Sequence, residues 1–229
     1  LYETCKFVEK AQQNGAAFIV VSAGHATERL DLLIPSDNYP EAVYRHFGWQ
    51  KKIKEIVAKI DAAAAKSGRS GEDVRLMAVT KTKSREQVEA AYKAGLRLFG
   101  ENRVQEAYEK YENFYPDAEL HLIGHLQSNK AKQVAEIAYC VQSIDKLKTA
   151  AELEKRCAAA GKKMDIFIEF NTSGEESKSG YLSKEKMYSE IEQMAEFPHL
   201  KVKGFMTIGP FTSDTDEIRR AFVTLRKLY

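Results

Sequence analysis

The chain has 229 residues, of which 44% are hydrophobic and 30% are charged, as in an ordinary soluble globular protein. Its 35 basic and 33 acidic side chains leave a net charge of +2, so we expect no binding to nucleic acid or to membranes. The three cysteines lack the spacing of a metal site or a disulfide framework, which predicts reduced thiols in a cytoplasmic protein.

The first 15 residues, LYETCKFVEKAQQNG, have a helical pattern that ends at Gly15. Residues 16–24, AAFIVVSAG, follow and are rich in β-branched residues, which predicts a buried strand. A signal peptide is the alternative interpretation, because lysines precede an apolar centre. The acidic and amide residues around those lysines favour the strand.

Residues 18–34, FIVVSAGHATERLDLLI, run from this strand through a turn of small residues into an amphipathic helix. A turn that leads into a helix points backbone N–H groups outward, which is an arrangement suited to binding a phosphate. Residues 41–48, EAVYRHFG, predict a weaker strand, and residues 48–70 have the character of an ordinary N-terminal helix.

From residue 50 onward, short apolar runs alternate with longer amphipathic segments, which predicts βαβ units and a parallel sheet. The six predicted strands cover residues 74–81, 96–101, 120–125, 139–145, 164–171 and 200–209. With residues 16–24 and 41–48 they make eight strands, which is the number in a closed (β/α)8 TIM barrel. An open doubly wound sheet is the alternative, because strand spacing alone does not establish closure.

The two ends of the chain, DEIRRAFVTLRKLY and LYETCKFVEKAQQNG, are both helical and uncapped, and joined they would form one amphipathic helix. We therefore expect a circular permutation within a single domain, residues 1–229. In this hypothesis residues 1–48 are the displaced last two βα units, strands 7 and 8, and residues 49–229 are the first six. A shortened chain with an added N-terminal extension is the alternative.

Functional groups in such a barrel lie at the C-terminal ends of the strands. Lys81 follows directly on the apolar run LMAVT, where partial loss of water disfavours the ammonium ion and frees the amine for Schiff-base formation with a carbonyl. A surface lysine at a strand end is the plainer interpretation. The other polar or small residues at predicted strand ends are Ser22, Gly24, Glu101, Asn102, Gly124, His125, Asp145, Asn171, Thr207 and Gly209.

No metal site is predicted. His121 and His125 lie on a strand-to-loop segment, so they do not share a helical face, and no neighbouring carboxylate completes a zinc motif. The chain also contains neither a dinucleotide-binding glycine motif nor a P-loop.

Six motifs together resemble the pyridoxal-phosphate-binding (PLP homeostasis) family: LMAVTKTKS, FGENRVQEA, HLIGHLQSNK, QSIDKL, NTSGEESKSG and KGFMTIGPF. The resemblance covers roughly residues 50–229, with all the motifs in family order. It implies an alanine-racemase-like barrel without a second domain. It also implies that Lys81 holds pyridoxal 5'-phosphate (PLP) as an aldimine, and that Asn102, Met206 and Thr207 line the cofactor.

The family's last two strands carry a Ser-x-Gly-x-Ser phosphate loop and a Val-Arg-Ile-Gly motif, and neither is present near the C-terminus of this chain. Ser22 and Gly24 match the phosphate loop, while Ala26 stands in place of its second serine. Only Phe47 and Gly48 remain of the second motif. The resemblance therefore implies a weakened site that binds PLP poorly or holds a phosphate or sulfate anion.

The resemblance implies a monomeric carrier in vitamin B6 homeostasis, without evident catalytic turnover. Two other functions stay open. A racemase-like PLP enzyme would need a second acid/base group, which another domain or subunit usually supplies. An engineered or remodelled barrel scaffold would have no native ligand, and a rearranged order of segments is more typical of engineering than of natural drift.

Overall fold

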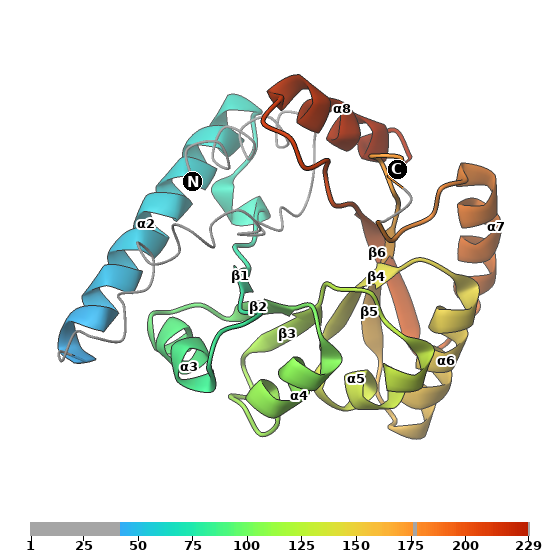
Figure 1. The fold of residues 1–229 in the computed structure, drawn as a ribbon, viewed down its shortest axis with the longest axis horizontal. Helices are drawn as coiled ribbons and strands as arrows, with labels where there is room; N and C mark the ends of the chain where they lie inside the picture. The colour runs from blue at the N-terminus through green and yellow to red at the C-terminus, as the bar shows by residue number, and fades with distance from the viewer. Residues whose placement is uncertain (1–41, 176–177, 229) are drawn as a thin grey trace. The chain divides into compact units, whose positions relative to one another are not determined.

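The computed structural model describes residues 42–175 and 178–228, which form an α/β structure (Figure 1). Its six-stranded sheet has the order β1-β2-β3-β4-β5-β6, and the pairs from β3 to β6 are parallel. The strands are β1 (Ala78–Val79), β2 (Leu98–Glu101), β3 (Glu119–Leu122), β4 (Cys140–Ile144), β5 (Met164–Glu169) and β6 (Leu200–Met206). All six strands predicted from residue 74 onward are confirmed.

Helices separate the strands, as the amphipathic segments predict. They are α2 (Ala42–Lys66), α3 (Arg85–Lys93), α4 (Val104–Tyr111), α5 (Ala131–Ile137), α6 (Leu147–Ala159), α7 (Lys184–Met194) and α8 (Thr215–Arg226), with short 3-10 helices η2 (Gly71–Asp73) and η3 (Ser128–Lys130). Gly95 and Gly161 follow the ends of α3 and α6 with φ of 105° and 61°. This left-handed conformation favours glycine and ends a helix.

One predicted strand is wrong. Residues 41–48 were expected to form an eighth strand, but from Ala42 onward they belong to α2. Val43 and Phe47 are four positions apart, no proline separates them from the amphipathic pattern that follows, and Gly48 between them and that pattern is accommodated within α2. A helical period therefore continues through this segment. The strand predicted over residues 16–24 and the helix predicted over residues 1–15 lie outside the described residues.

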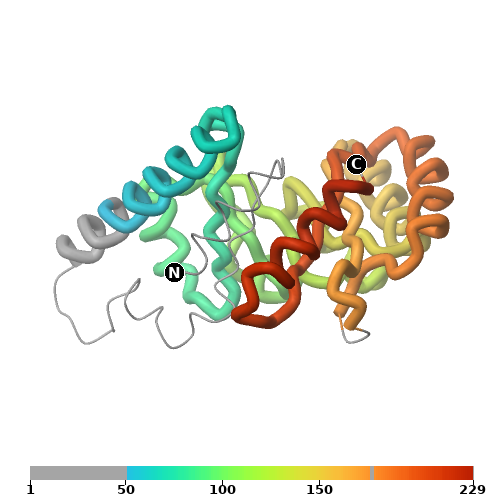
Figure 2. Tube along the Cα trace, turned by 90° about the horizontal axis from the view of Figure 1, so that it is seen from above, coloured from blue at the N-terminus to red at the C-terminus, as the bar shows by residue number. Residues whose placement is uncertain are grey.

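The chain divides into two compact units, Leu1–Phe99 and Gly100–Tyr229. In the described part of the first unit, α2 contacts α3 and η2, and a small core includes Ile60, Ala63 and Val74. In the second unit, α5 packs against α6 and α6 against α7. The Tyr188 hydroxyl of α7 donates to the Leu228 carbonyl at 2.6 Å, which places the end of α8 beside α7 (Figure 2).

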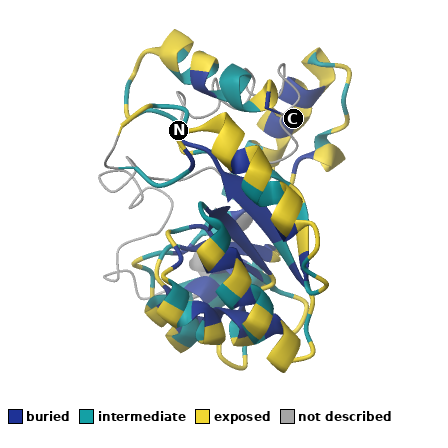
Figure 3. Cartoon of the chain, turned by 90° about the vertical axis from the view of Figure 1, so that its right-hand side faces the viewer, coloured by how far each residue is buried: buried dark blue, intermediate teal, exposed yellow. Residues whose placement is uncertain are grey.

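The large core of the second unit lies between the sheet and its helices. β4 is buried along its whole length and β5 nearly so, while the helices are buried on one side only (Figure 3). Ile166 and Ile168 of β5 belong to the same apolar cluster as Leu153 of α6 and Met187 of α7. Side chains alternate along a strand, so Phe167, which lies between these two isoleucines, points to the opposite face of the sheet.

The opposite face of the sheet has its own small apolar cluster, formed by Cys140, Phe167 and Met206 from β4, β5 and β6. Phe167 lies between Ile166 and Ile168 in the sequence, as the alternation requires. We call the side of the sheet that carries this cluster the inner face. No helix in the described part of the chain has the length and apolar character that crossing a membrane demands.

We predict that Leu153→Ala lowers the free energy of unfolding by about 2–5 kcal/mol, because Leu153 is 0% exposed and truncation leaves a cavity. Leu182→Ala is the matched control, since Leu182 is 63% exposed and its truncation should cost less than about 0.5 kcal/mol. Urea unfolding curves measure both. Equal losses in the two variants would contradict the core described here.

Candidate functional site

Lys81 lies two residues beyond the end of β1, near the strand end where the sequence predicts it. It is half-buried in a turn that the Lys83 N–H closes by donating to the Thr80 carbonyl at 3.0 Å. Thr82 has a φ of 64°, an uncommon conformation for a residue other than glycine. The backbone therefore turns sharply at Lys81, two residues after β1, and such strained turns cluster at functional sites.

The ends of β2, β3 and β4 are joined through backbone contacts around Gly124. The Ile123 N–H donates to the Glu101 carbonyl at 2.9 Å, and the Ser143 hydroxyl donates to the Gly124 carbonyl at 2.6 Å. A Cβ at position 124 would lie 2.3 Å from the Asn102 carbonyl oxygen. Glycine is therefore required where the chain passes Asn102.

Glu101, which precedes Asn102, is anchored by a buried ion pair. Its side chain is fully buried, and Lys110 of α4 donates to its Oε1 at 3.0 Å. Lys110 also contacts Glu106 on its own helix at 3.4 Å. Charge pairs of this kind hold buried carboxylates in place. This pair fixes α4 to the end of β2, and the sequence pattern gave no sign of it.

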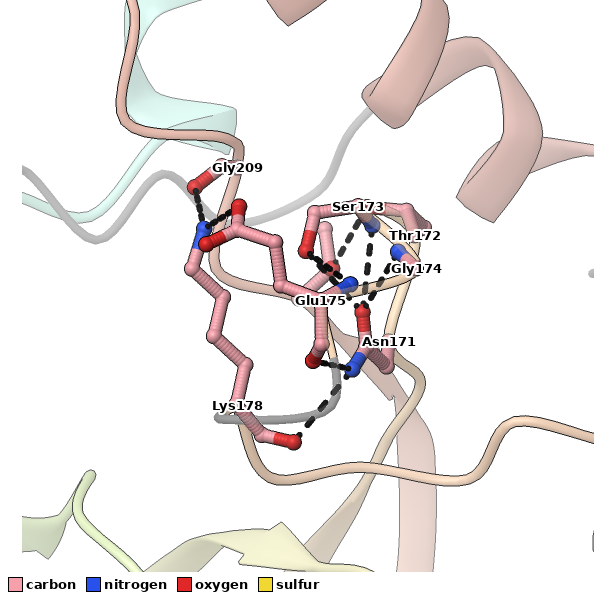
Figure 4. Close-up of polar contacts among 8 residues, drawn as sticks. Asn171, Thr172, Ser173, Gly174, Glu175, Lys178 and Gly209 are labelled. Carbon is pink, nitrogen blue, oxygen red and sulfur yellow. Dashed lines mark hydrogen bonds and ion pairs between the residues drawn. The ribbon is translucent and has the colours of Figure 1, made fainter.

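The segment after β5 is folded around the Asn171 side chain (Figure 4). Asn171 Oδ1 accepts from the Ser173 and Gly174 N–H groups at 3.2 and 2.9 Å, and from the Ser173 hydroxyl at 3.0 Å. Asn171 Nδ2 donates to the carbonyls of Glu175 and Lys178 at 2.8 and 3.3 Å. One amide therefore organises both halves of the segment that follows the strand.

The same segment returns to the strand at Tyr181. The Tyr181 N–H donates to the Glu169 carbonyl at 2.8 Å, and its carbonyl accepts from the Asn171 N–H at 3.0 Å. Gly180 has a φ of 111°, and a Cβ there would lie 2.7 Å from the Asn171 nitrogen. We call residues 171–180 the Asn171 loop.

Two contacts connect the Asn171 loop to the segment after β6. The hydroxyls of Thr172 and Thr207 lie 2.8 Å apart, and Lys178 Nζ donates to the Gly209 carbonyl at 3.2 Å (Figure 4). Two hydroxyls that bond to each other need one hydrogen for that bond, which leaves the second free to donate elsewhere. Thr207 is thus held by a partner that the sequence analysis did not identify.

The remaining predicted site residues are placed as follows. Met206 is the last residue of β6, and its side chain packs in the inner-face cluster. Asn102 lies directly beyond β2. Ser22 and Gly24 lie outside the described residues. Lys81 belongs to the first compact unit, whereas Asn102, Met206 and Thr207 belong to the second.

A polar network lies behind the Asn171 loop. The Tyr181 hydroxyl donates to Glu190 of α7, and the same carboxylate accepts from the Leu147 N–H, the first of α6, at 2.6 Å. Burial and the Glu190 carboxylate raise the pKa of the Tyr181 hydroxyl well above its usual range. The Glu190 carboxylate therefore both caps the N-terminus of α6 and holds the Tyr181 hydroxyl in place.

The histidines of the described chain do not gather at a metal site. His121 is buried, with its Nδ1 2.8 Å from the Gln142 amide nitrogen, and His125 lies against Asp145 with 3.2 Å between Nδ1 and Oδ2. No group of three or more potential metal-ligating side chains occurs among the described residues.

Comparison with known proteins gives consistent results. The chain matches the alanine racemase N-terminal domain family over residues 52–229. It is 35% identical over 179 residues, 78% of either chain, to a pyridoxal phosphate homeostasis protein of Aquifex aeolicus. It is 39% identical over 184 residues, again 78% of either chain, to a pyridoxal phosphate homeostasis protein of Vibrio alginolyticus.

Solved structures are similar over most of the chain. An unknown protein from Bifidobacterium adolescentis has a TM-score of 0.75 and 32% identity, covering 83% of this chain and 81% of its own. PipY of Synechococcus elongatus, solved with PLP bound, has a TM-score of 0.63 and 29% identity, covering 75% of this chain and 79% of its own.

We predict that Gly124→Ala lowers the free energy of unfolding by about 1–3 kcal/mol, because the added methyl group meets the backbone of Asn102, which has no room to move aside. Ser143→Ala, which removes only the hydrogen bond to the Gly124 carbonyl, should cost about 0.5–1.5 kcal/mol. Unfolding curves for both variants test this order. A Gly124→Ala protein as stable as the unaltered chain would contradict the close approach.

Proposed function

Since the chain belongs to the alanine racemase N-terminal domain family, we propose that it is a pyridoxal phosphate homeostasis protein that binds PLP through Lys81 without turnover of its own. The observation that carries this proposal is the identity of 35–39% to proteins of that name, together with the family match over residues 52–229, which contain Lys81 and all six motifs. The PLP-bound PipY structure supports the choice of cofactor.

The residues present suit this cofactor. PLP supplies an aldehyde that an amine can hold covalently and a phosphate that hydrogen-bond donors can hold. Lys81 is an amine on a sharply turned strand end, and Thr207 offers a hydroxyl whose position Thr172 restricts. The glycine at position 124 lets the chain beyond β3 pass close to the Asn102 backbone. We propose that Lys81 holds the aldehyde and that Asn102, Met206 and Thr207 line the ring.

In this function the chain's own residues position hydrogen-bond donors and restrict their movement. Asn171 orders the loop that presents Thr172, and Thr172 in turn fixes the Thr207 hydroxyl. Lys178 restrains the segment after β6 by donating a hydrogen bond to the Gly209 carbonyl. Donors held in advance bind a ligand with a smaller loss of conformational entropy, which suits a carrier.

We also propose that the six strands belong to an alanine-racemase-like TIM barrel within a single domain, with residues 16–24 supplying a further strand displaced to the front of the chain. The parallel pairing from β3 to β6 and the family match over residues 52–229 support the barrel part of this proposal. Ser22 and Gly24 would then provide the phosphate loop. A monomeric protein in the cytoplasm is part of the same proposal.

The first prediction from this function concerns Lys81. Lys81→Ala should abolish the visible absorbance that PLP acquires on covalent attachment to the protein. It should change the free energy of unfolding by less than about 0.5 kcal/mol, because a half-buried turn residue adds little to the core. Lys83→Ala, two residues further on, is the control and should keep the band. Borohydride reduction followed by peptide mapping should label Lys81, and label on another lysine would overturn the assignment.

The second prediction concerns the phosphate group. Each lost hydrogen bond to a charged group costs about 1.5–3 kcal/mol. Two such losses, from the missing arginine and glycine contacts, correspond to about two to four powers of ten in affinity. We therefore expect dialysis to remove PLP, and Ser22→Ala to weaken PLP binding further in an equilibrium titration. Stoichiometric PLP that survives dialysis would contradict a weakened phosphate site.

A further inference from the structure

Asp145 and Glu169 lie side by side at the ends of two neighbouring strands. Ile144 of β4 is in register with Ile168 of β5, and both isoleucines face the helix-side core. The residues that follow them, Asp145 and Glu169, therefore point to the inner face at the same level. The proposed function uses neither carboxyl group.

Both carboxyl groups have acceptor atoms without hydrogen-bond donors. Glu169 is only 2% exposed, and within the described part of the chain its carboxyl group makes no hydrogen bond or ion pair. Asp145 Oδ2 faces His125, and its Oδ1 lies 3.7 Å from Lys146 Nζ, but Oδ1 is buried and accepts no hydrogen bond from the described residues. Asp145 Oδ1 is therefore a buried acceptor without a donor, which is costly, and the nearly buried Glu169 carboxyl group beside it has no partner among the described residues.

Among the described residues, the donors that lie closest to this pair are already engaged elsewhere. Tyr181, the nearest phenol in the sequence, already donates to Glu190, and Lys146 and His125 lie against Asp145. Burial, with the negative charge of Asp145 added, raises the pKa of Glu169 to about 7. At neutral pH this carboxyl group is therefore partly ionised while its acceptor atoms stay unused.

We propose that Asp145 and Glu169 together bind a protonated primary amine at the inner face of the sheet. An ammonium group carries three N–H donors and one positive charge, so it can donate to Glu169 and to Asp145 Oδ1 at once. A divalent cation is less suited, because the described residues contain no group of three or more side chains of the kinds that hold a metal ion.

The inference deepens the proposed function, on which its biological purpose rests. PLP presents an aldehyde, and amines react with aldehydes only in their neutral form. Glu169 can take one proton from the bound ammonium, becoming a neutral carboxylic acid and leaving a neutral amine with its electron pair free. A carboxyl group with a pKa near neutrality is suited to that exchange.

The test measures binding of methylammonium to the full chain carrying Lys81→Ala. This variant has no Lys81 amine to hold PLP, so an effect of methylammonium cannot come from detaching PLP from Lys81. Methylammonium stays protonated at pH 8, as a lysine side chain does. We expect its chloride to raise the unfolding temperature at pH 8 above that in sodium chloride of equal ionic strength. The increase should grow with the logarithm of its concentration. Tetramethylammonium, which has no N–H donors, should have no such effect.

Two further variants assign the effect to the pair. Glu169→Gln should lose the methylammonium increase. Asp165→Asn should keep it, because Asp165 lies on the same strand but is paired with Lys203 at 3.8 Å. At pH 5, where Glu169 is protonated, the increase should also disappear. Equal unfolding temperatures in all three salts at pH 8 would overturn the proposal and would mean that the two carboxyl groups share only a proton. That result would leave the Lys81 absorbance test unaffected.

Discussion

The register between β4 and β5 is the constraint on which the rest of the second unit depends. Ile144 opposite Ile168 sends one set of side chains into the helix-side core. The same register sends the alternate set, including Phe167 and Glu169, to the inner face. A shift by one residue would exchange the two sets and place a carboxyl group among the isoleucines. The large apolar core is therefore what holds polar residues at the strand ends.

Beyond the strand ends, backbone atoms and short side chains fix the loops more than charges do. The Asn171 amide satisfies five donors and acceptors of its own loop, and Ser143 bonds a backbone carbonyl on the neighbouring strand. Such groups have few rotatable bonds, so little conformational entropy is lost when they are ordered. The long side chains make fewer such contacts: Lys178 connects the Asn171 loop to the segment after β6, and Lys110 connects α4 to β2.

Sequence periodicity predicted the six strands, and with them the position of Lys81, because an apolar run followed by a polar residue marks a strand end. It misassigned residues 41–48, where a short apolar segment fits a strand or a helix and only its continuation into α2 decides. It also missed the pairing of Thr172 with Thr207, which are 35 positions apart. Contacts between loops of different strands depend on the folded register and leave no local pattern.

Glu169 shows the same limit and its physical consequence. In the run MDIFIEFN it is one acidic residue among apolar ones, and only the neighbouring strand reveals that a second carboxyl group stands beside it. A folded-state pKa near 7, above the usual 4.5, means that the native chain binds this proton more tightly than the unfolded chain. Stability therefore falls as the pH rises from about 4.5 through about 7, and the core on the other face of β5 must offset that loss. A protein that keeps a destabilising group at a strand end, where the fold places its functional residues, is expected to use it.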